Sequence, residues 1–182
     1  MRVTGLAAAI VLVAMPAVAA GAEAVSGLPA QMAGVYKMRF KNALVGGDTY
    51  VSEDILEVVP YRSKAAYFRL HLDFYNGHEC SISGIAEARV DTLIYRGPAD
   101  MDGHPCMLSL RRARDGVHIS EGENGACRNQ TCGARGGYGF KSGGAADFPL
   151  ASRRPIRYLP RLLASSQYAD AIKAYTAKGG PH

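Results

Sequence analysis

The chain has 182 residues, of which 21 are Lys or Arg and 16 are Asp or Glu, so its formal net charge is +5. A nucleic-acid-binding protein usually carries a clustered basic face, whereas the basic and acidic residues here are mostly interleaved. So small an excess of positive charge favours contact with anionic surfaces but specifies no partner.

The first residues have the three parts of a secretory signal. Arg2 supplies a positive start, an uncharged apolar stretch follows, and the small residues at 17–19 or 20–22 match the usual cleavage pattern. The apolar stretch is shorter than the roughly 20 residues of a comfortable transmembrane helix, although an uncleaved anchor is the alternative. We therefore expect a signal peptide over residues 1–22 and a mature chain that is periplasmic or secreted, with a net charge of about +4 after the loss of Arg2.

Residues 35–121 have the alternation of seven short strands joined mostly by tight turns. In the segment AYFRLHLDF (66–74), apolar residues from Phe68 to Phe74 fall on one face, and Tyr67, Arg69, His71 and Asp73 fall on the other. Such strict alternation predicts a half-buried antiparallel strand, and the Asn-Gly pair at 76–77 predicts a hairpin turn after it. The spacing predicts a mainly β fold, an antiparallel meander that forms a small barrel or curled sheet.

Regular patterning stops between about residues 121 and 160, and one helix is predicted after it. In ASSQYADAIKAYTAKGG, Ser165 or Ser166 can cap the helix, and Tyr168, Ile172 and Tyr175 fall on one face. We expect this C-terminal α-helix to pack on the barrel wall or over an open end. The predicted organisation is a disulfide-stapled barrel-like domain over residues 23–160 with a glycine-rich loop, and the helix within residues 161–182 packed on the same domain.

Four cysteines lie in the mature chain, namely Cys80, Cys106, Cys127 and Cys132. An even number in an exported chain predicts disulfides, and a four-cysteine zinc site would need two close pairs where only one exists. Strand directions place all four at one end of the sheet. We favour Cys80–Cys106 with Cys127–Cys132, although an intervening strand would separate the first pair by about 9.5 Å, and a bridge needs Cα atoms within about 7 Å. Cys106–Cys127 with Cys80–Cys132 is the competing arrangement.

The segment CRNQTCGARGGYGFKSGG (127–144) combines cysteines, glycines and basic residues. It is not a phosphate-binding loop, because Phe140 separates Gly139 from Lys141 and no helix is predicted after it. One interpretation is a binding loop held by its cysteines, with these side chains exposed as anchors for a partner: Arg135, Tyr138, Phe140 and Lys141. The alternative is that Arg135 satisfies carbonyl groups at the barrel mouth while Tyr138 and Phe140 fill it.

Candidate catalytic groups are few. His104 lies near Asp100 and Asp102 in the loop DMDGHPC, which could surround a metal ion or could be an ordinary polar turn. Common hydrolase motifs such as G-x-S-x-G and H-E-x-x-H do not occur. A second basic stretch could contact an anionic envelope polymer or be a solvated linker, and it consists of Arg153, Arg154, Arg157 and Arg161.

The pattern CSISGIA … LIY … CMLSL … VHIS … CxxxxCGARG, within residues 34–148, resembles small exported bacterial proteins whose barrels are similar to those of lysozyme inhibitors and other lipocalin-like proteins. The resemblance implies a barrel that binds a protein or a small amphiphile in the periplasm. The chain departs from the family in its positive charge, and Ser142-Gly143 is not followed by the tyrosine of the inhibitory motif. We carry over the fold and not the inhibition.

We therefore predict an exported, non-catalytic binding or interaction module of the cell envelope, without a cofactor or bound metal. Its expected partner is an envelope protein or an anionic envelope polymer, and not a nucleic acid. The alternative is an envelope hydrolase or metal-dependent enzyme that uses His104, Asp100 and Asp102.

Overall fold

The computed structural model of the chain describes residues 27–133, 135–139 and 144–179. The predicted signal peptide lies outside these residues, as do Phe140 and Lys141 of the glycine-rich segment.

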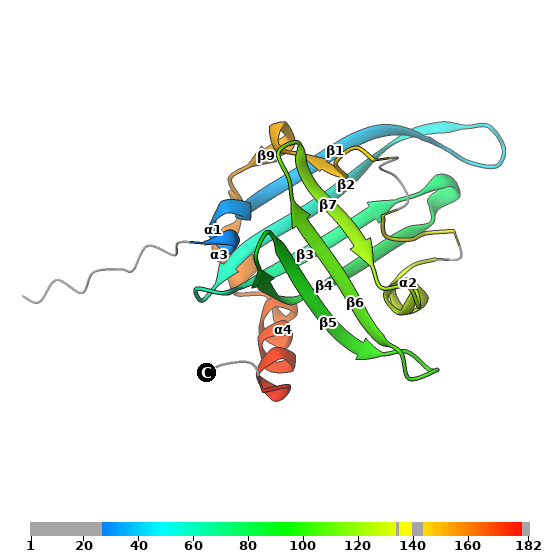
Figure 1. Cartoon of the computed structure of the whole chain (residues 1–182). Coiled ribbons are helices and arrows are strands. Elements are labelled where there is room, and N and C mark those ends of the chain that lie inside the picture. Colours follow the sequence, from blue (N-terminus) through cyan, green and yellow to red (C-terminus); the bar gives the residue numbers. More distant parts are fainter. Residues whose placement is uncertain (1–26, 134, 140–143, 180–182) are drawn as a thin grey trace, which may run out of the picture.

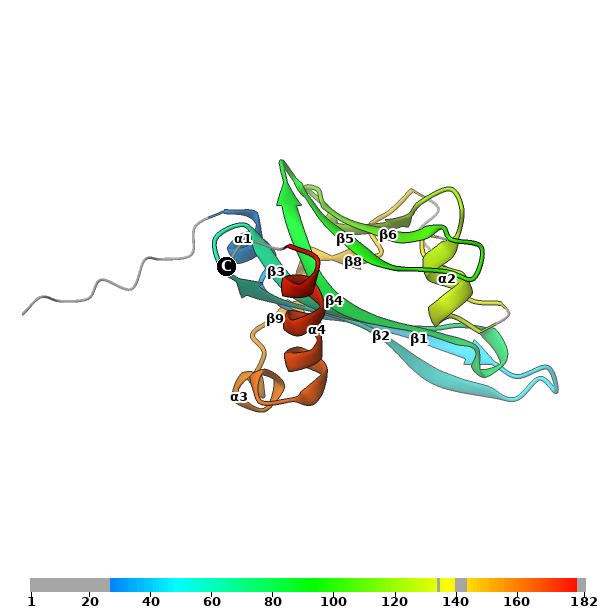
Figure 2. The same ribbon diagram turned by 90° about the horizontal axis from the view of Figure 1, so that it is seen from below.

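Seven strands follow one another as an antiparallel meander that curls into a barrel-like sheet (Figures 1 and 2). Two further short strands extend the sheet at its ends, giving the order β8-β7-β6-β5-β4-β3-β2-β1-β9. The mainly β fold class and the seven predicted strands are confirmed. The strands are β1 (Gly34–Ala43), β2 (Thr49–Tyr61), β3 (Ala65–Asp73), β4 (Glu79–Arg89), β5 (Thr92–Ala99), β6 (Pro105–Arg112), β7 (Gly116–Glu121), β8 (Phe148–Pro149) and β9 (Arg153–Arg154).

One segment, residues 148–154, joins the two edges of this sheet. Its first part, β8, pairs with β7, its last part, β9, pairs with β1, and the short 3-10 helix η2 (Leu150–Ser152) connects them. The segment lies so close to both edges that a Cβ atom at Gly116 would be 2.2 Å from the Phe148 carbonyl oxygen, and one at Gly34 would be 2.9 Å from that of Arg154. Glycine at both positions therefore lets this segment lie against both edges of the sheet.

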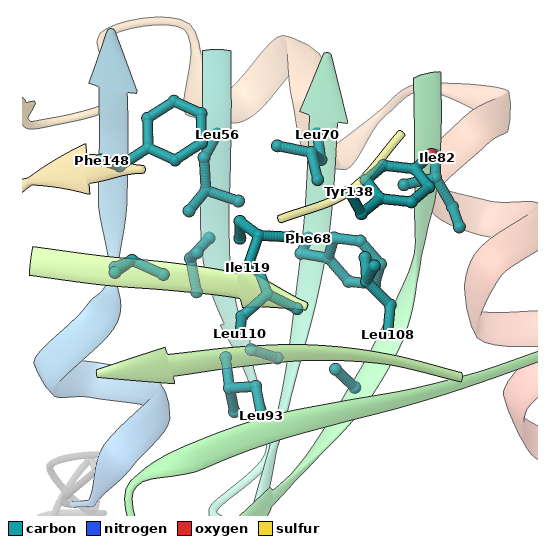
Figure 3. Packing of buried hydrophobic residues seen from close by; sticks show 14 of the residues in the cluster. Leu56, Phe68, Leu70, Ile82, Leu93, Leu108, Leu110, Ile119, Tyr138 and Phe148 are labelled. Atoms are coloured by element: carbon teal, nitrogen blue, oxygen red, sulfur yellow. The ribbon is translucent and has the colours of Figure 1, made fainter. Parts of the chain in front are cut away.

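Inward-facing side chains fill the barrel (Figure 3). The alternation predicted for β3 is confirmed, because Phe68, Leu70 and Leu72 are all buried. The ring of Phe68 meets that of Tyr95 edge to face, with centroids 5.2 Å apart. Small barrels of this size are commonly filled by their own side chains. Other members of the core are Leu56, Ile82, Leu93, Leu108, Leu110, Ile119, Tyr138 and Phe148.

The two ends of the barrel are closed by short helices. At one end, α1 (Leu28–Met32) accepts a hydrogen bond from the Tyr36 hydroxyl at the Met32 carbonyl, over 3.0 Å. At the other end, β4 and β5 diverge, since they pair only where residues 86–89 face residues 92–95. There α2 (Ala126–Thr131) lies between the layer that contains β5 and β6 and the layer that contains β4 (Figure 2).

Two disulfides attach α2 to both layers. Cys80 of β4 is bonded to Cys132, which follows α2, and Cys106 of β6 is bonded to Cys127 within α2. The favoured pairing of Cys80 with Cys106 and of Cys127 with Cys132 is therefore wrong, and the competing arrangement is present. The physical reason is the helix: five helical residues turn the chain through more than one full turn, so Cys127 and Cys132 point toward different strands.

The C-terminal helix packs on the outer wall of the barrel. It is α4 (Ser166–Ala177), preceded by α3 (Leu159–Leu163), and the Ser165 hydroxyl caps it by accepting a hydrogen bond from the Tyr168 backbone N–H. The predicted face of Tyr168, Ile172 and Tyr175 packs against a cluster that contains Tyr67 and Ile85. Tyr67 was expected on the polar face of its strand, but it is fully buried because α4 covers that part of the wall.

Among the helices that the structure describes, none combines the length and apolar character that crossing a bilayer requires.

Candidate functional site

The outward side chains of β1 to β4 form a polar surface beside α3 and α4, here called the outer polar face. The strand register sets them in rows across the sheet, so that Lys37, Ile55, His71 and Ser81 lie in one row. Residues two positions apart on each strand share the face, which brings Asp73 beside His71 and Glu79 beside Ser81. The face consists of Lys37, Arg39, Lys41, Glu53, Ile55, Glu57, Arg69, His71, Asp73, Glu79, Ser81 and Ser83.

A groove of about 360 Å³ lies where this face meets the C-terminal segment. Glu57 is fully buried at its base, and the Arg69 guanidinium binds both of its carboxylate oxygens through Nε and Nη2. The Tyr158 hydroxyl donates a hydrogen bond to the same carboxylate. The pKa of Tyr158 is raised to about 12, mainly by burial and secondly by this hydrogen bond to Glu57. Glu57 thus holds α3 against the wall, and the groove is lined by Ile55, Glu57, Arg69, His71, Ser81, Ser83, Tyr158 and Gln167 among others.

At the edge of the groove, four polar side chains of β3 and β4 form a compact cluster. The His71 Nε2 atom lies 3.1 Å from Asp73 Oδ1 and 4.0 Å from Glu79 Oε2. Its Nδ1 atom lies 2.8 Å from the Ser81 hydroxyl oxygen. His71, Asp73 and Glu79 each offer one ligand atom. These three atoms lie within 4.8 Å of one another, a spacing that could hold a metal ion.

Two basic stretches that are distant in the sequence meet on the outer wall. Because β9 pairs with β1, Arg154 lies opposite Val35, two residues before the outward row that begins at Lys37. The chain then continues through Arg157 into α3, which packs on the same wall. We call these residues the basic band, and all of them are exposed: Lys37, Arg39, Lys41, Arg154, Arg157 and Arg161.

Acidic charge balances only part of the basic band. Glu53 forms ion pairs with Lys37 and Arg39, at 2.6 and 2.8 Å. Within the described part of the chain, no carboxylate lies within ion-pair distance of the four arginines between residues 153 and 161. Arg153 and Arg154 instead donate to backbone carbonyls, including that of Gln31 at 2.8 Å.

The predicted binding loop is only partly a surface feature. Arg135 is exposed, whereas Tyr138 has 4% of its surface exposed and belongs to the barrel core. The Tyr138 and Thr131 hydroxyl oxygens are 2.5 Å apart, and burial raises the pKa of Tyr138 to about 12. The expectation that Tyr138 is an exposed anchor is wrong, because its ring fills the barrel end beneath α2. Phe140 and Lys141 lie outside the described residues, so their predicted role stays a prediction.

The loop at residues 100–104 brings together the three groups considered for a metal site. Asp100 Oδ1 lies 3.7 Å from His104 Nδ1, and Asp102 completes a group of ligand atoms within 4.8 Å. The same Asp100 oxygen accepts hydrogen bonds from the backbone N–H groups of Asp102 and His104, at 3.1 and 2.9 Å. The bond from the His104 backbone N–H is the main cause that lowers the pKa of Asp100. Asp100 thus stabilises a turn.

The outer polar face was not selected from the sequence as a site. The alternation had already placed His71 and Asp73 on one face, and the Asn76-Gly77 turn could have set them opposite Glu79 and Ser81. The basic band had no such local signal, because it depends on a two-residue strand pairing with β1.

Comparison of the chain with protein-family models, with curated proteins and with solved structures found no match. The fold and the surface chemistry therefore carry the functional argument. The class of protein that they define is a disulfide-stapled, mainly β domain with a filled barrel and a charged outer wall.

Proposed function

We propose that this protein is an exported, non-catalytic binding module that holds an anionic envelope polymer along its basic band. Two disulfides support an oxidising compartment outside the cytoplasm, where such bonds persist. Core side chains occupy the space in which a lipocalin-like protein would hold a ligand. A ligand of this protein is therefore expected to bind on the outer wall of the barrel.

The observation that carries the proposal is the meeting of β9 with β1. It places Arg154 opposite Val35, so that Arg154 and the arginines after it lie at the Lys37 end of the outward row of β1, although more than a hundred residues separate them in sequence. From Lys37 to Lys41 the row spans about 14 Å, at roughly 3.4 Å per residue. Positive charge spread over such a length suits an extended polyanion better than a small anion, which would need converging donors.

Three residues of the band are suited to a test, because the described structure gives them no ion pair or hydrogen bond that supports the fold: Lys41, Arg157 and Arg161. Replacing all three by Ala should leave folding unchanged and weaken the binding of a polyanion. The matched control replaces three exposed basic residues elsewhere, Arg111, Arg114 and Lys173, so that both variants lose the same net charge.

The measurement is the salt concentration that elutes each protein from an immobilised sulfated glycan, with neutral dextran as the reference matrix. We expect the band variant to elute at clearly lower salt than the control variant, because screening acts on the charges that touch the polymer. Equal elution of the two variants would show that only net charge matters and would remove the band as a site. Retention on neutral dextran would contradict the anionic class of ligand.

A further inference from the structure

We propose that His71, Asp73 and Glu79 form a binding site for one divalent transition-metal ion, with Zn²⁺ as the best match. The proposal stands apart from the basic band, since it depends on different residues of the outer polar face.

Strand register brings the three ligands together without any irregular loop. Asp73 lies directly opposite Glu79, and His71 lies directly opposite Ser81, on the paired strands β3 and β4. Both carboxylates approach the same ring nitrogen, His71 Nε2, at 3.1 and 4.0 Å. The ligand atoms of the three residues lie within 4.8 Å of one another, so a small movement of the exposed Glu79 side chain would bring all three around one ion.

Hydrogen bonds around the cluster orient the ligand groups. Metal-bound histidines usually engage their second ring nitrogen with a polar partner, and here the Ser81 hydroxyl is 2.8 Å from His71 Nδ1. Ligating carboxylates are commonly hydrogen-bonded too, and Asp73 Oδ2 accepts a bond from the Glu53 backbone N–H at 3.1 Å. Asp73 Oδ1 is thereby directed toward the histidine.

The strand that carries Glu79 is fixed from its other side. The neighbouring Cys80 is fully buried and bonded to Cys132, and the Gly133 backbone N–H donates to the Glu79 carbonyl at 2.9 Å. The disulfide-stapled end therefore keeps the Glu79 backbone in place while its side chain, 64% exposed, can close on an ion. Such preorganisation reduces the entropy cost of binding.

The ligand types indicate which ion the site prefers. One imidazole nitrogen with two carboxylate oxygens suits Zn²⁺, whereas Ca²⁺ takes six to eight oxygen ligands. Three protein ligands leave at least one coordination position for water or for a group of a bound molecule. The groove lined by His71 and Ser81 adjoins the cluster, so such a group can approach from there.

Calorimetric titration of the purified, oxidised protein with ZnCl₂, after treatment with a chelator, tests the proposal. We expect one Zn²⁺ per chain and much weaker binding of Ca²⁺. His71→Ala should lower the affinity for Zn²⁺ by at least about 100-fold. Ser81→Ala should lower it about tenfold, as is typical for the loss of a hydrogen bond to a ligating histidine.

The control is His104→Ala, which alters the other cluster of one histidine and two aspartates. It should leave the affinity for Zn²⁺ unchanged, and circular dichroism should show that every variant is folded. The absence of binding at millimolar Zn²⁺, unchanged affinity in His71→Ala, or loss of binding in His104→Ala would each overturn the assignment. Elution from the glycan column tests the basic band separately, so failure of one proposal leaves the other standing.

Discussion

The two disulfides should contribute unequally to the free energy of unfolding, because they close chain loops of different length. Cys80–Cys132 joins residues 52 apart, and Cys106–Cys127 joins residues 21 apart. In the chain-entropy description, loops of these lengths correspond to about 4.1 and about 3.3 kcal/mol at 25 °C. Alanine pairs are suitable replacements, since the side chains at three of the four positions are buried.

Urea unfolding, followed by circular dichroism, measures both double variants against the parent protein. We expect Cys80→Ala/Cys132→Ala to lose about 4 kcal/mol, and Cys106→Ala/Cys127→Ala to lose about 3 kcal/mol. A clearly larger loss for the shorter loop would refute the entropic reasoning. Labelling with a thiol reagent tests the pairing itself: Cys80→Ala should expose Cys132 to alkylation, and labelling of Cys106 in its place would show that the pairing is wrong.

Three further predictions concern side chains of the wall and core. Because the pKa of Tyr158 is raised to about 12, the folded protein holds this proton more tightly than the unfolded chain does. The free energy of unfolding therefore falls as the pH rises from about 10 toward 12. Tyr158→Phe should make that fall shallower, as measured by urea unfolding at several pH values. Gly84→Ala would set a Cβ atom 2.3 Å from the ring of Tyr95 and should cost about 1–3 kcal/mol, with a smaller cost when Tyr95→Leu is added. Arg69→Ala leaves a buried carboxylate unpaired and should cost about 3 kcal/mol in thermal unfolding, against less than about 1 kcal/mol for Arg39→Ala, whose side chain is 76% exposed.

Each of these predictions has an outcome that contradicts it. An unchanged pH dependence in Tyr158→Phe would show that burial and Glu57 do not hold its proton. Full additivity of Gly84→Ala and Tyr95→Leu would mean that the ring does not limit space at the strand. Equal losses for Arg69→Ala and Arg39→Ala would show that the Glu57 carboxylate remains well solvated.

The parts of the fold that follow from local pattern were predictable. Alternation in residues 66–74 depends only on the pleat of one strand, and it correctly placed Phe68, Leu70 and Leu72 in the barrel. The cap and apolar face of the last helix likewise need only a few neighbouring residues. The burial of Tyr67 was missed for the converse reason, because it requires a helix from about a hundred residues later to cover its strand.

The errors concentrate between residues 121 and 160, where regular elements are too short to leave a periodic signal. α2 has six residues, and β8 and β9 have two each. Without α2, nothing in the sequence showed that Cys127 and Cys132 would be turned toward different strands. Without β9, Arg154 and the arginines after it could not be placed near the start of β1, so the basic band could not be recognised.

The segment 148–154 has a consequence for the order in which the molecule can be completed. Strands β1 to β7 can pair with their sequence neighbours as each one emerges, but the edges of β1 and β7 stay open until this segment arrives. Open edges are templates for pairing with other chains. A chain that is synthesised from its N-terminus therefore has two unpaired strand edges until residues 148–154 have been made. A chain that lacks residues 148–182 should therefore aggregate more readily than the chain that retains them.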